Sequence, residues 1–395
     1  MDIVDHRRLG RELDLFDSDP LIGAGLPFWL PAGAAARHAV EEYVRELERR
    51  AGYQHVHSPA LGKRQMYELS GHWEHYRQDM FAPIDDNDQL VLRPSNCPHH
   101  ALIFKARQRS YRDLPLRIAE LGSMYRAERS GVLGGLNRVR AINLNDAHIF
   151  CAPDQVVDEV ASVLRLMRRA FAALGFEPKR YRLSLPANGD DAPELEEALR
   201  AESLSYVEER GEAAFYGPKI DVQVEDAAGR ESSISTVQLD FFQPRRFGLE
   251  YADASGGRQR PVMVHRSLVG SMERLFGHLI EVHQGAFPLW YAPVQLAVLP
   301  VSDDQAVEAN AAVRRAVEHD LRAEAHHEGS IGARIRHAAA RKVPYVGVIG
   351  AREAAAGLIA LRRRDGRQLP PMPIAEAIAL IDGKAAAREG RENLG

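Results

Sequence analysis

The chain has few of the features that mark secreted or membrane proteins. Only two of its 395 residues are cysteines, so no disulfide framework is expected. It has no run of about 18 apolar residues, the length that would predict a transmembrane helix. Residues 1–7 also lack the apolar core of a signal peptide. Together these absences predict a cytoplasmic protein with no membrane partner.

A strong excess of basic residues is also missing. The formal net charge is −4, whereas a protein that holds nucleic acid mainly through its charge is usually basic. We therefore expect no DNA partner, and any RNA contact must come from local patches. The candidate patches are Arg362-Arg363-Arg364 and the set Arg334, Arg336, Arg341 and Lys342. A solvated surface with no partner is the plain alternative for both.

The hydrophobic pattern predicts two units. In the first unit, proline and glycine interrupt the first thirty residues, and apolar residues spaced by three and four predict a helix over 33–51. Further elements are expected as strands over 116–128, 137–150, 215–224 and 232–241, a helix over 153–174, and a strand followed by a helix over 262–283. Beyond about residue 290 strands and helices alternate, which predicts a small α/β domain with a frayed tail after Gly383.

Three residues far apart in the sequence could hold one metal ion. Cys97, His148 and His265 offer a thiolate and two imidazoles, a donor set that suits zinc with an open fourth position. Spacing alone does not reveal such a site, because the gaps are long. Scattered cysteines and histidines are more often packing or surface residues, so the sequence around each one has to decide.

That surrounding sequence resembles the threonyl-tRNA synthetases. Nine matching segments occur in the family's order and cover nearly the whole chain; they include residues 96–98, 125–128, 146–150, 215–219 and 265–274. The resemblance implies an α+β class II synthetase catalytic domain, an antiparallel sheet with flanking helices, over 1–290. A small α/β anticodon-binding domain is implied over 291–395. It also implies a homodimer, and the family's N-terminal editing region is expected to be absent.

The implied activity is ATP-dependent conversion of threonine to threonyl-adenylate and transfer of threonine to tRNA(Thr). The resemblance makes Cys97, His148 and His265 ligands of Zn²⁺, and places Asp146 where it accepts a hydrogen bond from the substrate hydroxyl. Zinc suits this selection because the amino and hydroxyl groups of threonine can chelate it together, whereas valine has no hydroxyl. An apolar pocket would discriminate only about 100-fold, but a site built for the hydroxyl can reach about 10⁴-fold.

The nucleotide residues follow from the same resemblance, with Mg²⁺ accompanying ATP. Arg126 would bridge the carboxylate and the α-phosphate, a role that suits the planar fork of arginine. Arg274 would lie under the adenine and near the γ-phosphate. Glu128 would read the adenine amino group, and Arg138 would add a second phosphate contact. A surface ion pair is the plain alternative for each arginine.

Other positions match the substrate and RNA contacts of the family. Tyr216, Gln238 and Lys219 are expected near the threonine amino group, with Gln238 also beside the bound nucleotide. His72 would assist transfer to the tRNA ribose, since a histidine that titrates near neutral pH suits proton transfer. The positions that match anticodon-reading residues are Arg336, Glu353 and Arg362.

Several positions depart from the family's pattern; besides the four described next, they are Asn145, His99, Ser235 and residues 325–327. Ile142 stands where a phenylalanine stacks on adenine, a loss of about 0.5–1.5 kcal/mol. Leu144 replaces a glutamine, Ser95 replaces a methionine, and Glu328 replaces an asparagine that contacts a base. These departures leave two other functions open. The chain could adenylate threonine or a related β-hydroxy amino acid for a non-tRNA acceptor, or it could be a non-catalytic protein that binds tRNA or an amino acid.

Overall fold

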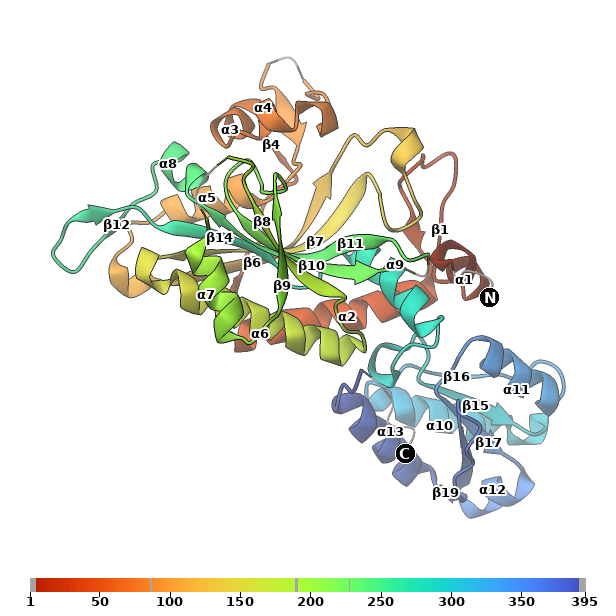
Figure 1. The fold of residues 1–395 in the computed structure, drawn as a ribbon. Coiled ribbons are helices and arrows are strands. Elements are labelled where there is room, and N and C mark those ends of the chain that lie inside the picture. Colours follow the sequence, from red (N-terminus) through yellow and green to blue (C-terminus); the bar gives the residue numbers. More distant parts are fainter. Residues whose placement is uncertain (1–4, 86, 189–190, 227, 391–395) are drawn as a thin grey trace.

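An eight-stranded sheet organises the first three quarters of the chain (Figure 1). The computed structural model describes residues 5–85, 87–188, 191–226 and 228–390. In spatial order the strands are β3 (Gln54–His55), β6 (Leu116–Tyr125), β7 (Ala141–Cys151), β14 (Val262–Ser267), β11 (Glu231–Asp240), β10 (Lys219–Glu225), β8 (Arg180–Leu185) and β9 (Tyr206–Arg210). Pairing is antiparallel from β6 to β8 and parallel at the two edges. The predicted antiparallel sheet with flanking helices is confirmed.

The two faces of the central strands have different roles. Side chains alternate along a strand, and Ala147, Ile149 and Cys151 of β7 join the main core, which also contains the long helices α2 (Pro31–Arg50), α6 (Val156–Leu174) and α9 (Met272–His283). Phe150 of β7 belongs to a second core, on the side of α5 (Cys97–Lys105). His148 alternates with the main-core residues, so it lies on the α5 side.

Shorter elements surround this sheet. They are α1 (His6–Glu12), β1 (Phe16–Asp17), β2 (Phe28–Trp29), β4 (Leu61–Lys63), α3 (Arg64–Leu69), α4 (His72–His75), β5 (Leu90–Leu92), α7 (Pro193–Ala201), α8 (Phe242–Arg246), β12 (Tyr251–Ala252) and β13 (Arg258–Gln259). Helix α1 was not predicted, because the whole of 1–30 was expected to be irregular. The proline and glycine residues behind that expectation begin only at Pro20, after α1 has ended. Asp5 caps α1 by accepting a hydrogen bond from the backbone N–H of Arg7.

The C-terminal unit is a five-stranded sheet with four helices, blue in Figure 1. Its strands are, in spatial order, β16 (Ala323–Ala325), β15 (Leu296–Pro300), β17 (Tyr345–Ile349), β18 (Leu358–Arg363) and β19 (Met372–Pro373). Its helices are α10 (Ala306–Glu318), α11 (Ile331–Ala340), α12 (Ala351–Ala356) and α13 (Ile374–Ala386). The alternating pattern therefore predicted the α/β class correctly. None of the helices in the described ranges has the length and apolarity needed to cross a lipid bilayer.

Two segments attach the C-terminal unit to α2. Trp290, just before the unit, packs its ring 5.0 Å from that of Tyr43 and donates a hydrogen bond to the carbonyl of Ala173. Arg388, just after α13, forms an ion pair with Glu46 and lies over the Tyr43 ring, 5.1 Å from its centre. The prediction of a frayed tail is therefore wrong as far as Arg388; residues 391–395 lie outside the described residues.

Candidate active site

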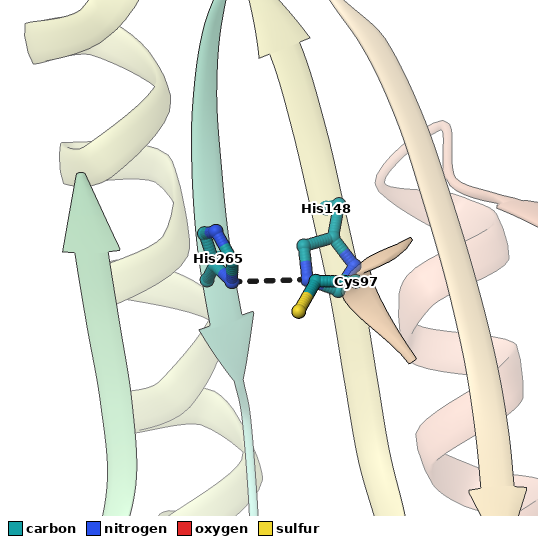
Figure 2. A group of neighbouring side chains, drawn as sticks. All are labelled: Cys97, His148 and His265. Atoms are coloured by element: carbon teal, nitrogen blue, oxygen red, sulfur yellow. Dashed lines mark hydrogen bonds between the residues drawn. The ribbon is translucent and has the colours of Figure 1, made fainter. Parts of the chain in front are cut away.

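The sheet and α5 bring the three predicted metal ligands together. His148 on β7 and His265 on β14 face each other in register, and Cys97, the first residue of α5, lies beside them (Figure 2). Their ligand atoms all lie within 4.8 Å of one another. His148 Nε2 is 3.1 Å from His265 Nδ1. All three side chains are buried.

The donor set fits zinc by its chemistry and its spacing. Two nitrogen ligands of a tetrahedral zinc ion lie about 3.3 Å apart, given Zn–N distances of about 2.0–2.1 Å, and the two ring nitrogens are 3.1 Å apart. Burial alone would raise the pKa of Cys97, but His72, His148 and His265 together hold that pKa well below its usual value. The thiolate form, which binds metal, is therefore favoured.

Each histidine is oriented by a neighbour that sequence reasoning missed. His265 Nε2 lies 2.8 Å from Asp240 Oδ2, and His148 Nδ1 lies 2.8 Å from Nδ1 of His100. His100 in turn contacts Glu120. Burial would lower the pKa of His265, yet Asp240 and Cys97 raise it to about 10. The sequence held a signal, since His100 comes three residues after Cys97 and Asp240 lies within the matched segment 236–241.

A cavity of about 250 Å³ opens beside these ligands. Its walls include His148 and His265, and at the same end Asp146, whose pKa burial raises to about 6. The Tyr216 ring stacks on His265 at 4.7 Å, and its hydroxyl donates a hydrogen bond to Gln238. The structure thus groups five predicted residues, from four separate segments, at one end of a cavity.

The opposite end of the cavity is lined by arginines. Arg126 and Arg274 both contribute to its wall. Arg274 donates hydrogen bonds to the carbonyls of Ser233 at 3.0 Å and Asn137 at 3.3 Å. Burial, together with the nearby Arg126 and Arg138, lowers the pKa of Arg274. This concentration of positive charge suits an anionic ligand.

Glu128 and Arg138 form an ion pair next to the arginine end, with 2.8 Å between Oε2 and Nη2. The Glu128 side chain is buried, while that of Arg138 is half exposed. Neither is among the residues that line the cavity. Both residues lie near Arg274, because their charges act on its pKa.

Two predicted residues lie behind the cavity wall. His72 Nε2 is 3.5 Å from Cys97 Sγ, and its Nδ1 is 2.8 Å from the Ser70 hydroxyl. The ammonium of Lys219 lies 3.0 Å from Asp221. Neither side chain is among the cavity-lining residues. The predicted proton-transfer role of His72 and the substrate contact of Lys219 would both require movement or an indirect action.

Four of the departures from the family pattern line the cavity: Ser95, Ile142, Leu144 and Ser235. The Ser95 hydroxyl lies 2.9 Å from Cys97 Sγ. A larger depression, about 850 Å³, runs along the end of α6 and contains none of the predicted site residues. The smaller cavity is therefore the candidate active site.

The predicted RNA contacts lie on three elements of the C-terminal unit. Arg336 on α11 and Arg362 on β18 are exposed, whereas Glu353 on α12 is half buried and accepts a hydrogen bond from the backbone N–H of Gly350. Glu328 is exposed on the loop before α11.

The basic patch around α11 is smaller than the sequence suggested. Arg334 is buried, donating hydrogen bonds to the carbonyls of Pro300 and His327. Arg341 forms an ion pair with Glu324, and Arg364 donates to the carbonyls of Phe287 and Lys342. These three arginines already pair with groups of the protein itself, so Arg336 and Arg362 are the better candidates for RNA.

Comparison with known proteins gives the relatives of the chain. Residues 76–283 match the tRNA synthetase class II core domain (G, H, P, S and T), and residues 295–384 match the anticodon binding domain. A threonine–tRNA ligase of Geobacillus kaustophilus is 45% identical over 407 residues, which cover 99% of this chain and 62% of that relative. One of Pediococcus pentosaceus is 46% identical over 375 residues, covering 91% and 58%. The chain spans about three fifths of the length of these curated relatives.

Two solved structures of aminoacyl-tRNA synthetases also resemble this chain. A crystal structure described as the RNA binding domain of threonyl-tRNA synthetase from Cryptosporidium parvum matches with a TM-score of 0.90 and 34% identity, covering 96% of this chain and 98% of that one. A Giardia lamblia prolyl-tRNA synthetase, at 19% identity, has a TM-score of 0.75 over 97% of this chain and 78% of its own. The second likeness concerns the fold alone.

Proposed function

The chain belongs to the threonyl-tRNA synthetases, a family of class II aminoacyl-tRNA synthetases, and from this premise we propose that it activates threonine with ATP and transfers it to tRNA(Thr). One observation carries the proposal. A single cavity is lined by His148 and His265 at one end, with Cys97 grouped beside them, and by Arg126 and Arg274 at the other. An amino acid and a nucleotide can therefore meet between them.

The metal end would select the amino acid. Cys97, His148 and His265 would hold Zn²⁺, and the ion would act as a Lewis acid that orients the amino and β-hydroxyl groups of threonine. Asp146 lies at the same end, where its carboxylate can accept a hydrogen bond from the hydroxyl.

Tyr216 and Gln238 would close the amino-acid end. The Tyr216 ring stacks on His265, and its hydroxyl is bonded to Gln238, so the two side chains hold each other in place. Polar atoms fixed in this way can pair with a substrate hydroxyl or amino group, and a substrate that lacks the group would leave them unpaired. A β-hydroxy amino acid is therefore favoured over valine.

The arginine end would stabilise the transfer step. The threonine carboxylate attacks the α-phosphorus of ATP, pyrophosphate leaves, and negative charge grows on the phosphate oxygens. Arg126 and Arg274 line this part of the cavity, and fixed cations beside developing charge lower the barrier. Mg²⁺ would accompany the phosphates, and Glu128 would give up Arg138 to pair with the adenine amino group.

We propose a catalytic unit over 1–290 and an anticodon-binding unit over 291–395. The two separate sheets support this division. Exposed Arg336 and Arg362 would contact unpaired anticodon bases. We also propose a cytoplasmic location, and a homodimer is the expectation that the resemblance adds. His72 stays a candidate for the transfer step to the tRNA ribose.

The test is zinc-loaded charging of total tRNA with labelled threonine, run beside ATP–pyrophosphate exchange on the same preparation. We expect both reactions with threonine and neither with valine. The variants Arg336→Ala and Arg362→Ala should raise the KM for tRNA and leave exchange unchanged, with exposed Arg314→Ala as the matched control.

Two other outcomes would change the assignment. Exchange without charging would favour an enzyme that adenylates threonine, or a related β-hydroxy amino acid, for a non-tRNA acceptor. Ser95 and Leu144 in the cavity wall and exposed Glu328 are the observations behind that alternative. Absence of both reactions in the zinc-loaded protein would contradict the proposed function and leave a binding protein.

A further inference from the structure

We propose that His100 is a positioning residue that relays the negative charge of Glu120 to His148 and thereby decides which nitrogen of His148 faces the cavity. The relay would keep Nδ1 of His148 protonated and leave Nε2 with a lone pair for the metal. This inference deepens the proposed function, because it rests on the same metal site. It concerns the free protein and the metal alone, so it can be tested without any aminoacylation assay.

The relay is a continuous chain of buried polar contacts. His100 Nε2 lies 3.2 Å from Glu120 Oε2, and His100 Nδ1 lies 2.8 Å from His148 Nδ1. His148 Nε2 then lies 3.1 Å from His265 Nδ1, the contact drawn as a dashed line in Figure 2. Glu120, His100 and His148 are each at most 2% exposed. Water therefore cannot easily replace any member of the chain.

The carboxylate at the start of the relay is held in its ionised form. Arg93 Nη2 lies 3.1 Å from Glu120 Oε1, and Ser58 donates to the carboxylate from its hydroxyl at 2.6 Å and its backbone N–H at 3.2 Å. Burial would raise the pKa of Glu120, but His100, Ser58 and Arg93 lower it to about 2. An ionised carboxylate only accepts hydrogen bonds, so His100 must donate to it from Nε2.

The positions of the ring protons on His100 and His148 follow from this ionised carboxylate. Arg93 already balances the charge of Glu120, so a neutral His100 avoids burying a second, uncompensated positive charge. A neutral His100 that carries its proton on Nε2 has a lone pair on Nδ1. That lone pair can only accept, so His148 must donate from Nδ1. Neutral His148 then has its lone pair on Nε2, toward Cys97 and His265.

The sheet register explains why His148 needs an intermediate. On β6, His148 is opposite Ile118, whereas Glu120 is opposite Asp146, two residues along. The carboxylate is thus displaced from the ring, and His100, reaching down from α5, bridges the gap. His265 needs no such bridge, because Asp240 contacts its Nε2 directly at 2.8 Å. Metal-binding histidines commonly donate their second nitrogen to a carboxylate or carbonyl; here one histidine does so directly and the other through a second ring.

Two substitutions at His100 separate the relay from mere packing. In His100→Gln the amide nitrogen can donate to Glu120 while the amide oxygen accepts from His148, so the direction of both hydrogen bonds is kept. In His100→Leu the volume is retained but the relay is lost. The matched control is His278→Leu, because His278 on α9 is also buried but lies outside this network.

Zinc affinity of the purified protein, measured by competition with a chromogenic chelator, is the first readout. We expect His100→Leu to weaken Zn²⁺ binding about 10–100-fold, the usual effect of losing an outer-shell partner. His100→Gln and His278→Leu should stay within a few-fold of the native value. Equal loss in His100→Gln and His100→Leu, or no loss in a folded His100→Leu variant, would overturn the proposal.

The second readout needs no mutation. Nitrogen-15 NMR of the metal-free native protein reports which ring nitrogen of each histidine carries the proton. We expect the proton on Nδ1 of His148 and on Nε2 of His100. A proton on Nε2 of His148, or a doubly protonated His100, would overturn the proposal even if His100→Leu failed to fold. If the protein binds Zn²⁺ and shows these protonated nitrogens but charges no tRNA, the proposed function is contradicted and the relay still holds.

Discussion

The two ends of the candidate active site are built on opposite plans. At the metal end, Cys97, His148 and His265 are buried, and the outward nitrogen of each ring has a protein partner. At the nucleotide end Arg126 is exposed, and within the described ranges no side-chain hydrogen bond of its guanidinium is found. The histidines of the metal end have their partners before any ligand binds, whereas the nucleotide end gathers three arginines around Glu128, which leaves a surplus of positive charge.

By this contrast, the choice of amino acid belongs to the metal end and turnover of the nucleotide belongs to the arginine end. A buried, fully bonded shell fixes its donors to within a fraction of an ångström, which suits the choice between amino acids of nearly equal shape. Arg126, which is exposed, is repelled by the nearby Arg274 and can close on a polyphosphate that must also leave. Substitutions at one end should therefore leave the other intact.

The largest effect is expected from Cys97→Ala. Removing the thiolate deletes a ligand, so Zn²⁺ affinity should fall by more than the roughly 10–100-fold that loss of an outer hydrogen bond costs. Threonine-dependent pyrophosphate exchange should disappear with it. Zinc content after gel filtration measures the first effect. Cys151→Ala, at the other buried cysteine, is the control and should keep its zinc; equal zinc in both variants would refute the ligand assignment.

The next effect is expected from Arg126→Gln. Loss of one fixed positive charge beside the reacting phosphate should lower kcat/KM for exchange by about 10²–10³-fold. The zinc content should not change, because the two ends share no side chain. Arg129→Gln, an exposed residue outside the cavity wall, should retain exchange activity. A fall in zinc content in Arg126→Gln would show that the two ends are coupled.

A smaller gain is expected from Ile142→Phe. An aromatic ring at this cavity wall can stack on adenine, and the added stacking of about 0.5–1.5 kcal/mol should tighten ATP binding up to about tenfold. Isothermal titration with a non-hydrolysable ATP analogue measures the change. Ile142→Leu, which adds no ring, should bind like the native protein, and the KM for threonine should stay constant. Weaker nucleotide binding in Ile142→Phe would mean that the ring has no room.

The smallest effect concerns stability without ligand. Arg126 lies close enough to Arg274 to lower its pKa, so the free protein carries unrelieved repulsion. Arg126→Gln should raise the thermal midpoint of the ligand-free protein by about 1–2 °C, equivalent to roughly 0.5 kcal/mol. The difference should vanish in about 1 M salt, where the screening length falls to about 3 Å. A lower midpoint would show that Arg126 supports the fold through contacts of its own.

Features encoded by neighbouring residues were predicted well. Apolar spacing predicted a helix over 33–51, observed as 31–50, and alternating β-branched residues predicted the strand observed at 231–240. The metal ligands came from resemblance, because Cys97 and His265 are separated by more than half of the first unit and no local spacing relates them. The ligands come together because β7 pairs with β14, and the residues adjacent to each ligand in sequence do not determine that pairing.

The missed features depend on contacts between distant segments. Nothing adjacent to Glu120 in sequence shows that it meets His100, and a histidine's tautomer depends entirely on such partners. The arginines were misjudged for the same reason. Arg334 and Arg336 look equivalent in sequence, but α11 turns Arg334 inward to the carbonyl of Pro300 and leaves Arg336 outside.

Tyr43 has a mechanical consequence for the whole molecule. Trp290 and Arg388, at the two ends of the C-terminal unit, both rest on this one ring. Trp290 also donates a hydrogen bond to the carbonyl of Ala173, Tyr291 donates one to the carbonyl of Leu174, and Arg388 also pairs with Glu46. The attachment therefore spans α2 and α6, and it couples the C-terminal unit to both of the long helices that support the catalytic sheet.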